Sequence, residues 1–177
     1  DEGLNPEEIS DDKIFGNVSG KNIYRTYQDR LLTLNVVDYG DLLLQNLNIF
    51  KNNPEILTTY QKKFKYILVD EYQDTNICQN RWLNLLAENF KNICAVGDDD
   101  QSIYSWRGAE VKNILKFGDT FTNTTTIKLE ENYRSTNNIL EAANCLVGKN
   151  KERLGKNLWT NQGRGDKIQV INISNSE

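Results

Sequence analysis

The sequence contains no histidine and no methionine among its 177 residues. The absence of histidine excludes catalysis by an imidazole and metal sites that depend on histidine ligands. Because a complete translation product begins with methionine, we expect the chain to be a piece of a longer protein. No apolar run approaches the roughly 20 residues that a membrane-spanning helix needs.

Cysteine is scarce as well, with three residues that lie far apart in apolar surroundings, Cys78, Cys94 and Cys145. Their spacing fits no zinc site, and the chain shows no signal peptide. This pattern predicts reduced, core-facing cysteines in a cytoplasmic protein.

Positive charge is limited, because 21 lysines and arginines stand against 25 acidic residues and the net charge is −4. Nucleic-acid-binding proteins usually show a basic patch, and no basic run occurs here. The chain also lacks the Gly-x-x-x-x-Gly-Lys-Ser/Thr loop that cradles phosphates in many nucleotide-binding proteins. Any nucleotide site that this chain contributes to would therefore be incomplete within it.

An apolar run that leads directly into two acids is the most informative feature that is present. Residues 66–69 read Tyr-Ile-Leu-Val, and Asp70 and Glu71 follow. A short apolar run of this kind predicts a buried strand, and ligands of open α/β sheets bind beyond the carboxyl ends of such strands. One acid there can hold Mg²⁺ and the next can deprotonate a water molecule. A strand that simply ends in a solvated turn is the alternative.

Two further apolar runs end in the same way, at residues 93–96 before Gly97 and Asp98, and at residues 125–129 before Glu130. The segments between the runs, 76–90 and 109–117, show apolar residues at helical spacing. Alternating strands and helices predict an α/β fold with a parallel sheet, in which all three polar segments reach one edge.

Helical spacing also marks three other segments. Residues 23–34 and a segment that begins after Asp38 predict two helices ahead of the first strand. Residues 136–147 predict another after the third strand, and residues 168–171 predict a further strand. Asp74 or Thr75 is the predicted N-cap of the helix that starts near residue 76.

Four segments resemble motifs of the UvrD/PcrA/Rep group of superfamily 1 DNA helicases. Residues 68–76, Leu-Val-Asp-Glu-Tyr-Gln-Asp-Thr-Asn, resemble motif II, and residues 96–109, Val-Gly-Asp-Asp-Asp-Gln-Ser-Ile-Tyr-Ser-Trp-Arg-Gly-Ala, resemble motif III. Residues 129–135, Leu-Glu-Glu-Asn-Tyr-Arg-Ser, are similar to motif IV, with Glu131 where glutamine is usual. Residues 38–44 resemble the acidic–aromatic helix start upstream of motif II. The likeness covers residues 27–160.

The resemblance implies ATP and Mg²⁺ as ligands and assigns five residues to them. Asp70 would coordinate Mg²⁺, and Glu71 would activate the attacking water. Gln101 would sense the γ-phosphate, Arg134 would contact it as an arginine finger, and Tyr133 would lie against the adenine. An arginine in that role is worth about 10³–10⁵ in rate.

The same resemblance implies single-stranded DNA and single-strand/double-strand junctions as partners. Tyr104 and Trp106 would stack on bases, and Arg107 would assist them. Stacking is worth about 1–3 kcal/mol per base and tolerates any sequence, which suits a motor that moves along arbitrary DNA. Packing in the core is the alternative for the two aromatic side chains, and their polar neighbours favour a partly exposed surface.

For the fold, the resemblance implies a partial RecA-like parallel sheet with flanking helices, of the P-loop NTPase type but without the P-loop segment, and a helical N-terminal part. Residues 1–37 would end a helical insertion, 38–134 would form the second half of the first RecA-like domain, and 135–177 would open the second. We expect such a piece to expose apolar surface that other parts of its own helicase chain cover.

The function expected from these observations is that of a fragment of an ATP-dependent 3′–5′ DNA helicase acting in repair or replication. Without a phosphate-binding loop, the isolated chain is not expected to turn over. Three alternatives stay open: the helicase part of a RecB/AddA-type helicase–nuclease, a Mg²⁺-dependent phosphatase or nuclease built on Asp70, Asp98 and Asp100, and a non-catalytic interaction domain. Cleavage with Mg²⁺ but without ATP would favour the phosphatase or nuclease.

Overall fold

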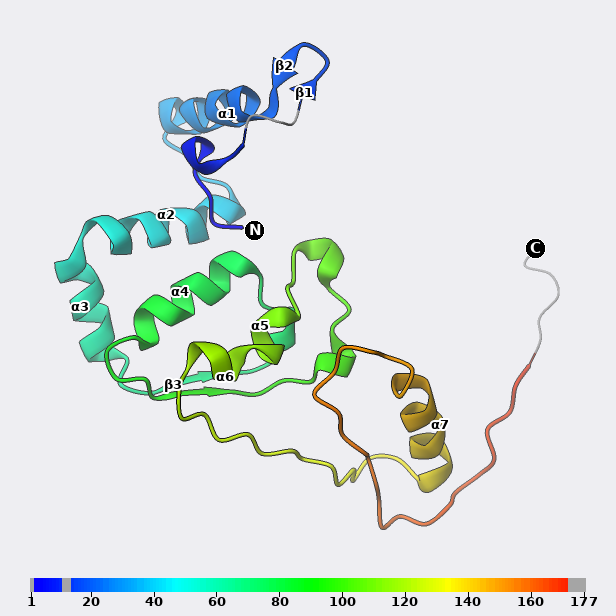
Figure 1. Cartoon of the computed structure of the whole chain (residues 1–177). Helices are drawn as coiled ribbons and strands as arrows, with labels where there is room; N and C mark the ends of the chain where they lie inside the picture. The colour runs from blue at the N-terminus through cyan, green and yellow to red at the C-terminus, as the bar shows by residue number, and fades with distance from the viewer. Residues whose placement is uncertain (1, 11–13, 172–177) are drawn as a thin grey trace. The chain divides into compact units, whose positions relative to one another are not determined.

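The computed structural model of this chain describes residues 2–10 and 14–171. The chain forms two compact units, Asp1–Phe121 and Thr122–Glu177, and each is described by itself. Helices dominate the first unit and pack against one face of a small parallel sheet (Figure 1). Within the described residues, no helix is both long and apolar enough to cross a bilayer.

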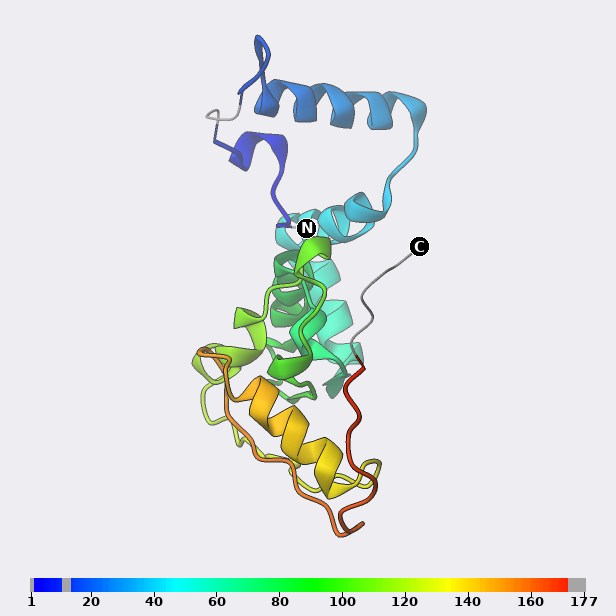
Figure 2. The same ribbon diagram turned by 90° about the vertical axis from the view of Figure 1, so that its right-hand side faces the viewer.

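The N-terminal part of the first unit is helical, as predicted. A short 3₁₀ turn, η1 (Pro6–Glu8), and a two-stranded hairpin, β1 (Ile14–Phe15) and β2 (Val18–Ser19), precede helix α1 (Gly20–Leu34). The Ser19 hydroxyl accepts the N–H of residue 22 and so caps the start of α1. Figure 2 shows α1 as one long helix on the far side of α2 from α3.

Three helices pack together to form the core of the first unit. They are α2 (Tyr39–Asn52), α3 (Pro54–Lys63) and α4 (Ile77–Ala87). Most of the buried apolar side chains come from α2 and α4: Leu44, Leu47, Phe50, Cys78, Leu83, Leu86 and Ala87. The buried faces match the apolar faces predicted from the sequence only in part: Leu47, Phe50 and Leu86 are buried as predicted, whereas Leu42, which has the same helical spacing, is exposed.

Side-chain caps set where α2 and α4 begin. Asp38 caps α2, as predicted, by accepting the backbone N–H three residues later. Helix α4 is capped by Asn76, whose Oδ1 accepts the N–H of Gln79 at 2.8 Å. The predicted caps, Asp74 and Thr75, are wrong because Asp74 lies in a 3₁₀ turn and the Thr75 hydroxyl donates to the carbonyl of residue 72.

The sheet consists of β3 (Ile67–Val69) and β4 (Ile93–Ala95), which pair in parallel. Two bonds continue the ladder past the strand ends: the N–H of Val96 donates to the carbonyl of residue 69, and the N–H of Tyr72 donates to the Val96 carbonyl. The polar segments after the two strands are therefore held side by side at one edge, as predicted.

One face of this sheet is open within the described residues. The register partners Leu68 and Cys94 lie on that face, and both are exposed. Cys145 is exposed as well, so the prediction of a core position holds for Cys78 and is wrong for the other two cysteines. The expected exposure of apolar surface is therefore observed on this face of the sheet.

The predicted third strand, residues 125–129, does not form. This stretch pairs with no strand, and the side chains of Ile127 and Leu129 are exposed. β-branched residues favour an extended backbone, but a strand also needs a partner and a surface to pack against, and the run has neither among the described residues. The strand predicted at residues 168–171 is absent for the same reason.

The single helix predicted at residues 109–117 is replaced by two short helices, α5 (Lys112–Leu115) and α6 (Phe117–Thr120). Lys116 separates them because its backbone, at φ −104° and ψ 14°, leaves the helical region.

Residues 122–171 of the second unit, which the structure describes, form one helix, α7 (Asn137–Val147), within the predicted range and preceded by Thr136. Its Leu140 side chain is buried. Glu130 and Asn132, near the start of this unit, exchange backbone hydrogen bonds with Trp159. This exchange fixes residues 130–132, which precede the motif IV arginine, against a segment close to the end of the described chain.

Candidate functional site

The turn after β3 carries the two adjacent acids. Asp70 Oδ1 accepts the N–H of Glu71 at 2.9 Å, and both residues are exposed. Glu71 has a left-handed backbone, at φ 50° and ψ 44°, which non-glycine residues adopt rarely and which often marks a functional position. The chain turns sharply at Glu71 and enters the 3₁₀ helix η2 (Tyr72–Asp74).

Gln73 lies in η2, immediately after this turn, and is only 1 % exposed. Its Nε2 donates to Oε2 of Glu71 at 2.7 Å, and its Oε1 accepts the N–H of Asp98 at 2.9 Å. The buried Gln73 amide therefore forms one hydrogen bond with the acid after β3 and another with the loop after β4. Sequence reasoning gave Gln73 no role, because no local pattern shows that a polar residue two positions after an exposed acid will be buried.

The loop after β4 approaches Gln73 closely. A Cβ atom on Gly97 would lie 2.6 Å from Gln73 Oε1 and 2.8 Å from the Cδ1 atom of Ile114. No ordinary Cβ contact is that short, so glycine is required for the approach. Asp98 then accepts the N–H of Asp100 on Oδ1 at 3.1 Å and the Gln101 amide on Oδ2 at 2.6 Å, within the 3₁₀ helix η3 (Asp99–Gln101).

These bonds connect two predicted site residues that are 30 positions apart in the chain. The path runs from Glu71 through Gln73 and Asp98 to Gln101. Each bond is 2.9 Å or shorter, and the central amide is buried, which strengthens its hydrogen bonds relative to those in water. The structure thus joins the candidate general base to the candidate phosphate sensor.

The predicted DNA-contacting residues follow on the same loop, in the 3₁₀ helix η4 (Ser105–Arg107). The Trp106 side chain is 73 % exposed, so packing in the core does not explain it. The Arg107 guanidinium carbon lies 4.6 Å from the centre of the Trp106 ring and 5.2 Å from that of Tyr104. One cation holds both rings, whose centres are 6.5 Å apart, on an exposed surface.

The far end of this loop is anchored to the motif II segment. The N–H of Glu110 donates to the Thr75 carbonyl at 3.0 Å, and Asn76 forms an isolated bridge with Ala109. Asn113 also donates to the Thr75 carbonyl, at 3.0 Å. The loop from Asp98 to Ala109 therefore begins on Gln73 and ends on the two residues that follow η2.

The motif IV residues lie in the second unit. The Tyr133 hydroxyl donates to Oε2 of Glu131 at 2.6 Å, and this hydrogen bond raises the pKa of the phenol. Asn132 Oδ1 accepts the backbone N–H of Arg134 at 3.0 Å. Tyr133 and Arg134 are both exposed. Glu131, the departure from the usual glutamine, thus has a definite local role as the acceptor for Tyr133.

A metal-dependent phosphatase or nuclease finds no support in the described part of the chain. No group of three or more acids and cysteines is placed to hold a metal ion in that part. The Asp98 carboxylate instead accepts hydrogen bonds from the Gln101 amide and from the N–H of Asp100.

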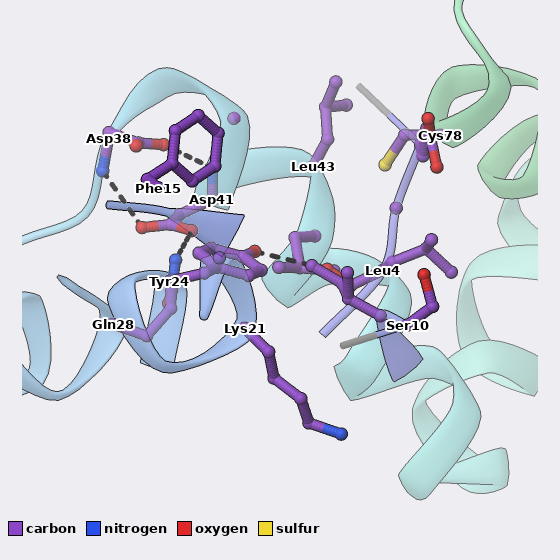
Figure 3. Close-up of a pocket in the computed structure, with 16 residues that line it drawn as sticks. Leu4, Ser10, Phe15, Lys21, Tyr24, Gln28, Asp38, Asp41, Leu43 and Cys78 are labelled. Atoms are coloured by element: carbon purple, nitrogen blue, oxygen red, sulfur yellow. Dashed lines mark hydrogen bonds between the residues drawn. The ribbon is translucent and has the colours of Figure 1, made fainter. Parts of the chain in front are cut away.

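A separate cavity of about 550 Å³ lies between the N-terminal segment, α1 and the start of α2 (Figure 3). None of the predicted site residues lines it. Its buried carboxylate, Asp41, accepts the Gln28 amide at 2.8 Å, and the Tyr24 hydroxyl donates to the Leu4 carbonyl. Burial raises the pKa of the Cys78 thiol at its edge, which keeps that thiol protonated and unreactive.

Comparison with known proteins gives family matches along the whole chain. The UvrD/REP helicase N-terminal domain matches residues 1–144, and the UvrD-like helicase C-terminal domain matches residues 127–177. The chain is 54 % identical to "Probable DNA helicase II homolog" of Rickettsia felis over 97 % of its length and 26 % of that protein. It is 46 % identical to "DNA helicase II" of Escherichia coli over 96 % of its length and 24 % of that protein.

A third relative is "ATP-dependent DNA helicase PcrA" of Staphylococcus epidermidis, 52 % identical over 83 % of this chain and 20 % of that protein. The chain therefore spans about a quarter of the length of the curated relatives that it matches.

Proposed function

This chain belongs to the UvrD/REP helicase family, and we propose that it is the part of an ATP-dependent DNA helicase that carries motifs II to IV. The complete protein would move 3′ to 5′ along single-stranded DNA in repair or replication. The bond path from Glu71 to Gln101 carries this proposal, because it lies at the carboxyl edge of a parallel sheet, where ligands of such sheets bind.

For ATP hydrolysis, Glu71 would accept a proton from the attacking water as the water oxygen bonds to the terminal phosphorus and the bond to ADP breaks. Gln101 would contact the γ-phosphate. Asp70 would hold Mg²⁺, which would neutralise charge on the phosphates when bound. A single exposed carboxylate suits this ion, because Mg²⁺ in such sites takes one or two carboxylates together with phosphates and water.

Two residues of the second unit are proposed to contact the nucleotide. Arg134 would stabilise charge on the γ-phosphate during transfer, and Tyr133 would lie against the adenine. Anchoring of the Tyr133 hydroxyl on Glu131 supports this role, because it limits the positions that the exposed ring can take.

Single-stranded DNA and single-strand/double-strand junctions are the proposed partners of the exposed aromatic loop. Tyr104 and Trp106 would stack on bases, and Arg107 would order the two rings and add positive charge. The net charge of −4 fits a contact that relies on stacking more than on phosphate binding.

We also propose the domain division 1–37, 38–134 and 135–177, with a cytoplasmic location for the complete protein. Other parts of the same helicase chain would supply the phosphate-binding loop and would cover the open face of the sheet. On this proposal, the isolated chain does not turn over ATP.

Strand separation by the full-length protein tests the proposed function. With ATP and Mg²⁺, the protein should unwind duplexes that carry a 3′ single-stranded tail and leave duplexes with a 5′ tail intact. The Glu71→Gln variant should bind the same duplexes and unwind neither. Unwinding of the 5′-tailed duplex alone would contradict the direction, and Mg²⁺-dependent cleavage of DNA without ATP would contradict the helicase assignment.

A further inference from the structure

The least exposed polar residue in the described structure is one that the catalytic roles above do not use. Gln73 is 1 % exposed, and both ends of its amide are hydrogen bonded, to Glu71 on one side and to the N–H of Asp98 on the other. We propose that Gln73 is a positioning residue that orients Glu71 for water activation and ties this orientation to the loop at residues 98–109. This inference rests on the proposed function.

The chemistry of the two contacts suits a primary amide. The Glu71 carboxylate can only accept, and the Asp98 N–H can only donate, so the side chain between them must offer one donor and one acceptor. Glutamate would keep the acceptor but would place an oxygen against the Glu71 carboxylate. Methionine has a similar length and keeps neither contact. Because Gln73 itself is buried, water does not readily replace its two hydrogen bonds when the side chain is changed.

The geometry leaves little freedom between Gln73 and the loop. Gly97 approaches so closely that a Cβ atom there would lie 2.6 Å from Gln73 Oε1. A displacement of the loop start therefore has to move the Gln73 amide, and the amide is bonded to Glu71.

The loop is fastened at both ends to one short segment. Gln73 holds its beginning at Asp98, and Thr75 and Asn76 hold its end at Ala109 and Glu110. The exposed rings of Tyr104 and Trp106 lie between these anchors. A base that stacks on the rings therefore contacts a loop that is hydrogen bonded at Asp98 to Gln73. Gln73 in turn positions Glu71. Coupling between DNA binding and hydrolysis then needs no movement elsewhere in the unit.

Steady-state ATP hydrolysis by the full-length protein, with and without single-stranded DNA, tests the role of Gln73. We expect Gln73→Met to lower kcat about ten- to hundredfold, as for a catalytic group held out of position, while KM for ATP changes little. The stimulation of hydrolysis by DNA should fall with it. Gln73→Glu, which keeps the anchor on Asp98, should lose kcat but retain more of the DNA stimulation than Gln73→Met.

Gln61→Met is the matched control for a stability effect. The Gln61 amide donates to the Leu85 carbonyl at 2.7 Å and links α3 to α4, away from the turn after β3. This variant should lose stability without a change in kcat or in DNA stimulation. Wild-type kcat and wild-type DNA stimulation in folded Gln73→Met would overturn the proposal, as would equal kinetic losses in Gln61→Met.

The same experiment separates failure of this inference from failure of the proposed function. If wild-type protein hydrolyses ATP and Glu71→Gln does not, the proposed function stands, and the Gln73 variants decide the inference alone. If Glu71→Gln hydrolyses ATP as fast as wild type, the proposed function fails first, and the inference fails with it.

Discussion

The N–H of Asp98 donates to Oε1 of Gln73 at 2.9 Å, and this bond fastens the loop after β4 to the turn after β3. The two segments that follow the neighbouring strands β3 and β4 are thereby joined to each other. Glu71, the acid that would activate water, and the rings of Tyr104 and Trp106, which would contact DNA, both belong to these joined segments. Substitutions there are therefore expected to change ATP hydrolysis, DNA binding or both.

Trp106→Ala should weaken binding of single-stranded DNA by the full-length protein and leave nucleotide binding nearly unchanged. The exposed ring is available to a base, and one stacked base is worth about 1–3 kcal/mol, or roughly a five- to 150-fold change in affinity. Fluorescence anisotropy with a labelled oligonucleotide measures it. Tyr66→Ala, which removes another exposed aromatic ring, is the control. Equal DNA affinity in wild type and Trp106→Ala would exclude the stacking role.

Arg134→Ala should reduce ATP turnover much more than ATP affinity. An arginine that contacts the γ-phosphate mainly during transfer is worth about 10³-fold or more in rate. Rapid-quench measurement of phosphate release, together with equilibrium nucleotide binding, separates the two effects. Arg164→Ala, an exposed arginine of the same unit, should behave as wild type. Wild-type turnover in Arg134→Ala would remove this residue from the site.

Gly97→Ala should destabilise the chain by about 1–3 kcal/mol, as overpacking of a closely packed site usually does. The added methyl group would meet Gln73 and Ile114 at less than 3.0 Å. Urea unfolding of this chain, followed by circular dichroism, measures the loss. Gly118→Ala adds the same methyl group at a position with no atom within 4 Å and should not destabilise the chain. Similar midpoints for Gly97→Ala and wild type would contradict the close contact.

Asp38→Ala should cost about 0.5–2 kcal/mol of stability near neutral pH, because it removes the N-cap of α2. The backbone N–H of Asp41 and then the Tyr27 hydroxyl donate to the Asp38 carboxylate and lower its pKa. Because this pKa is lowered, the charged cap contributes fully to the free energy of unfolding at pH values above the unfolded-state pKa of about 3.9. The contribution is lost as the pH falls through the folded-state pKa.

Urea midpoints of wild type and Asp38→Ala at several pH values measure this dependence. The difference between the two proteins should be constant from neutral pH down to about pH 5 and should shrink below the ordinary aspartate pKa of about 3.9. Asp29→Ala, which removes an exposed acid from α1, controls for the change in net charge. A difference that grows on acidification would contradict the assignment of Asp38 as a charged cap.

Local sequence patterns were sufficient to predict the helices and strands that form from nearby residues. Apolar spacing placed α1, α2, α4 and α7, and the apolar runs before Asp70 and Gly97 placed β3 and β4 in parallel. The pairing of the polar segments followed from that parallel order. These elements depend on side-chain periodicity and capping, which neighbouring residues largely determine.

Features that depend on distant partners were not predictable from local patterns. Residues 125–129 have a strand-like composition, yet no partner strand lies beside them in the described structure. Burial of Gln73 depends on the approach of Gly97 and Asp98, which lie more than 20 positions away. The left-handed backbone of Glu71 likewise depends on the surrounding bonds and not on residue type.

Glu71 is proposed to activate water in a motor that responds to DNA. ATP turnover by the full-length protein, measured without DNA and with saturating single-stranded DNA, tests it most directly. Single-stranded DNA should raise wild-type turnover, and Glu71→Gln should lower turnover by about 10²–10⁴-fold while still binding ATP. Wild-type turnover in Glu71→Gln, or a wild-type rate that does not respond to DNA, would contradict the account.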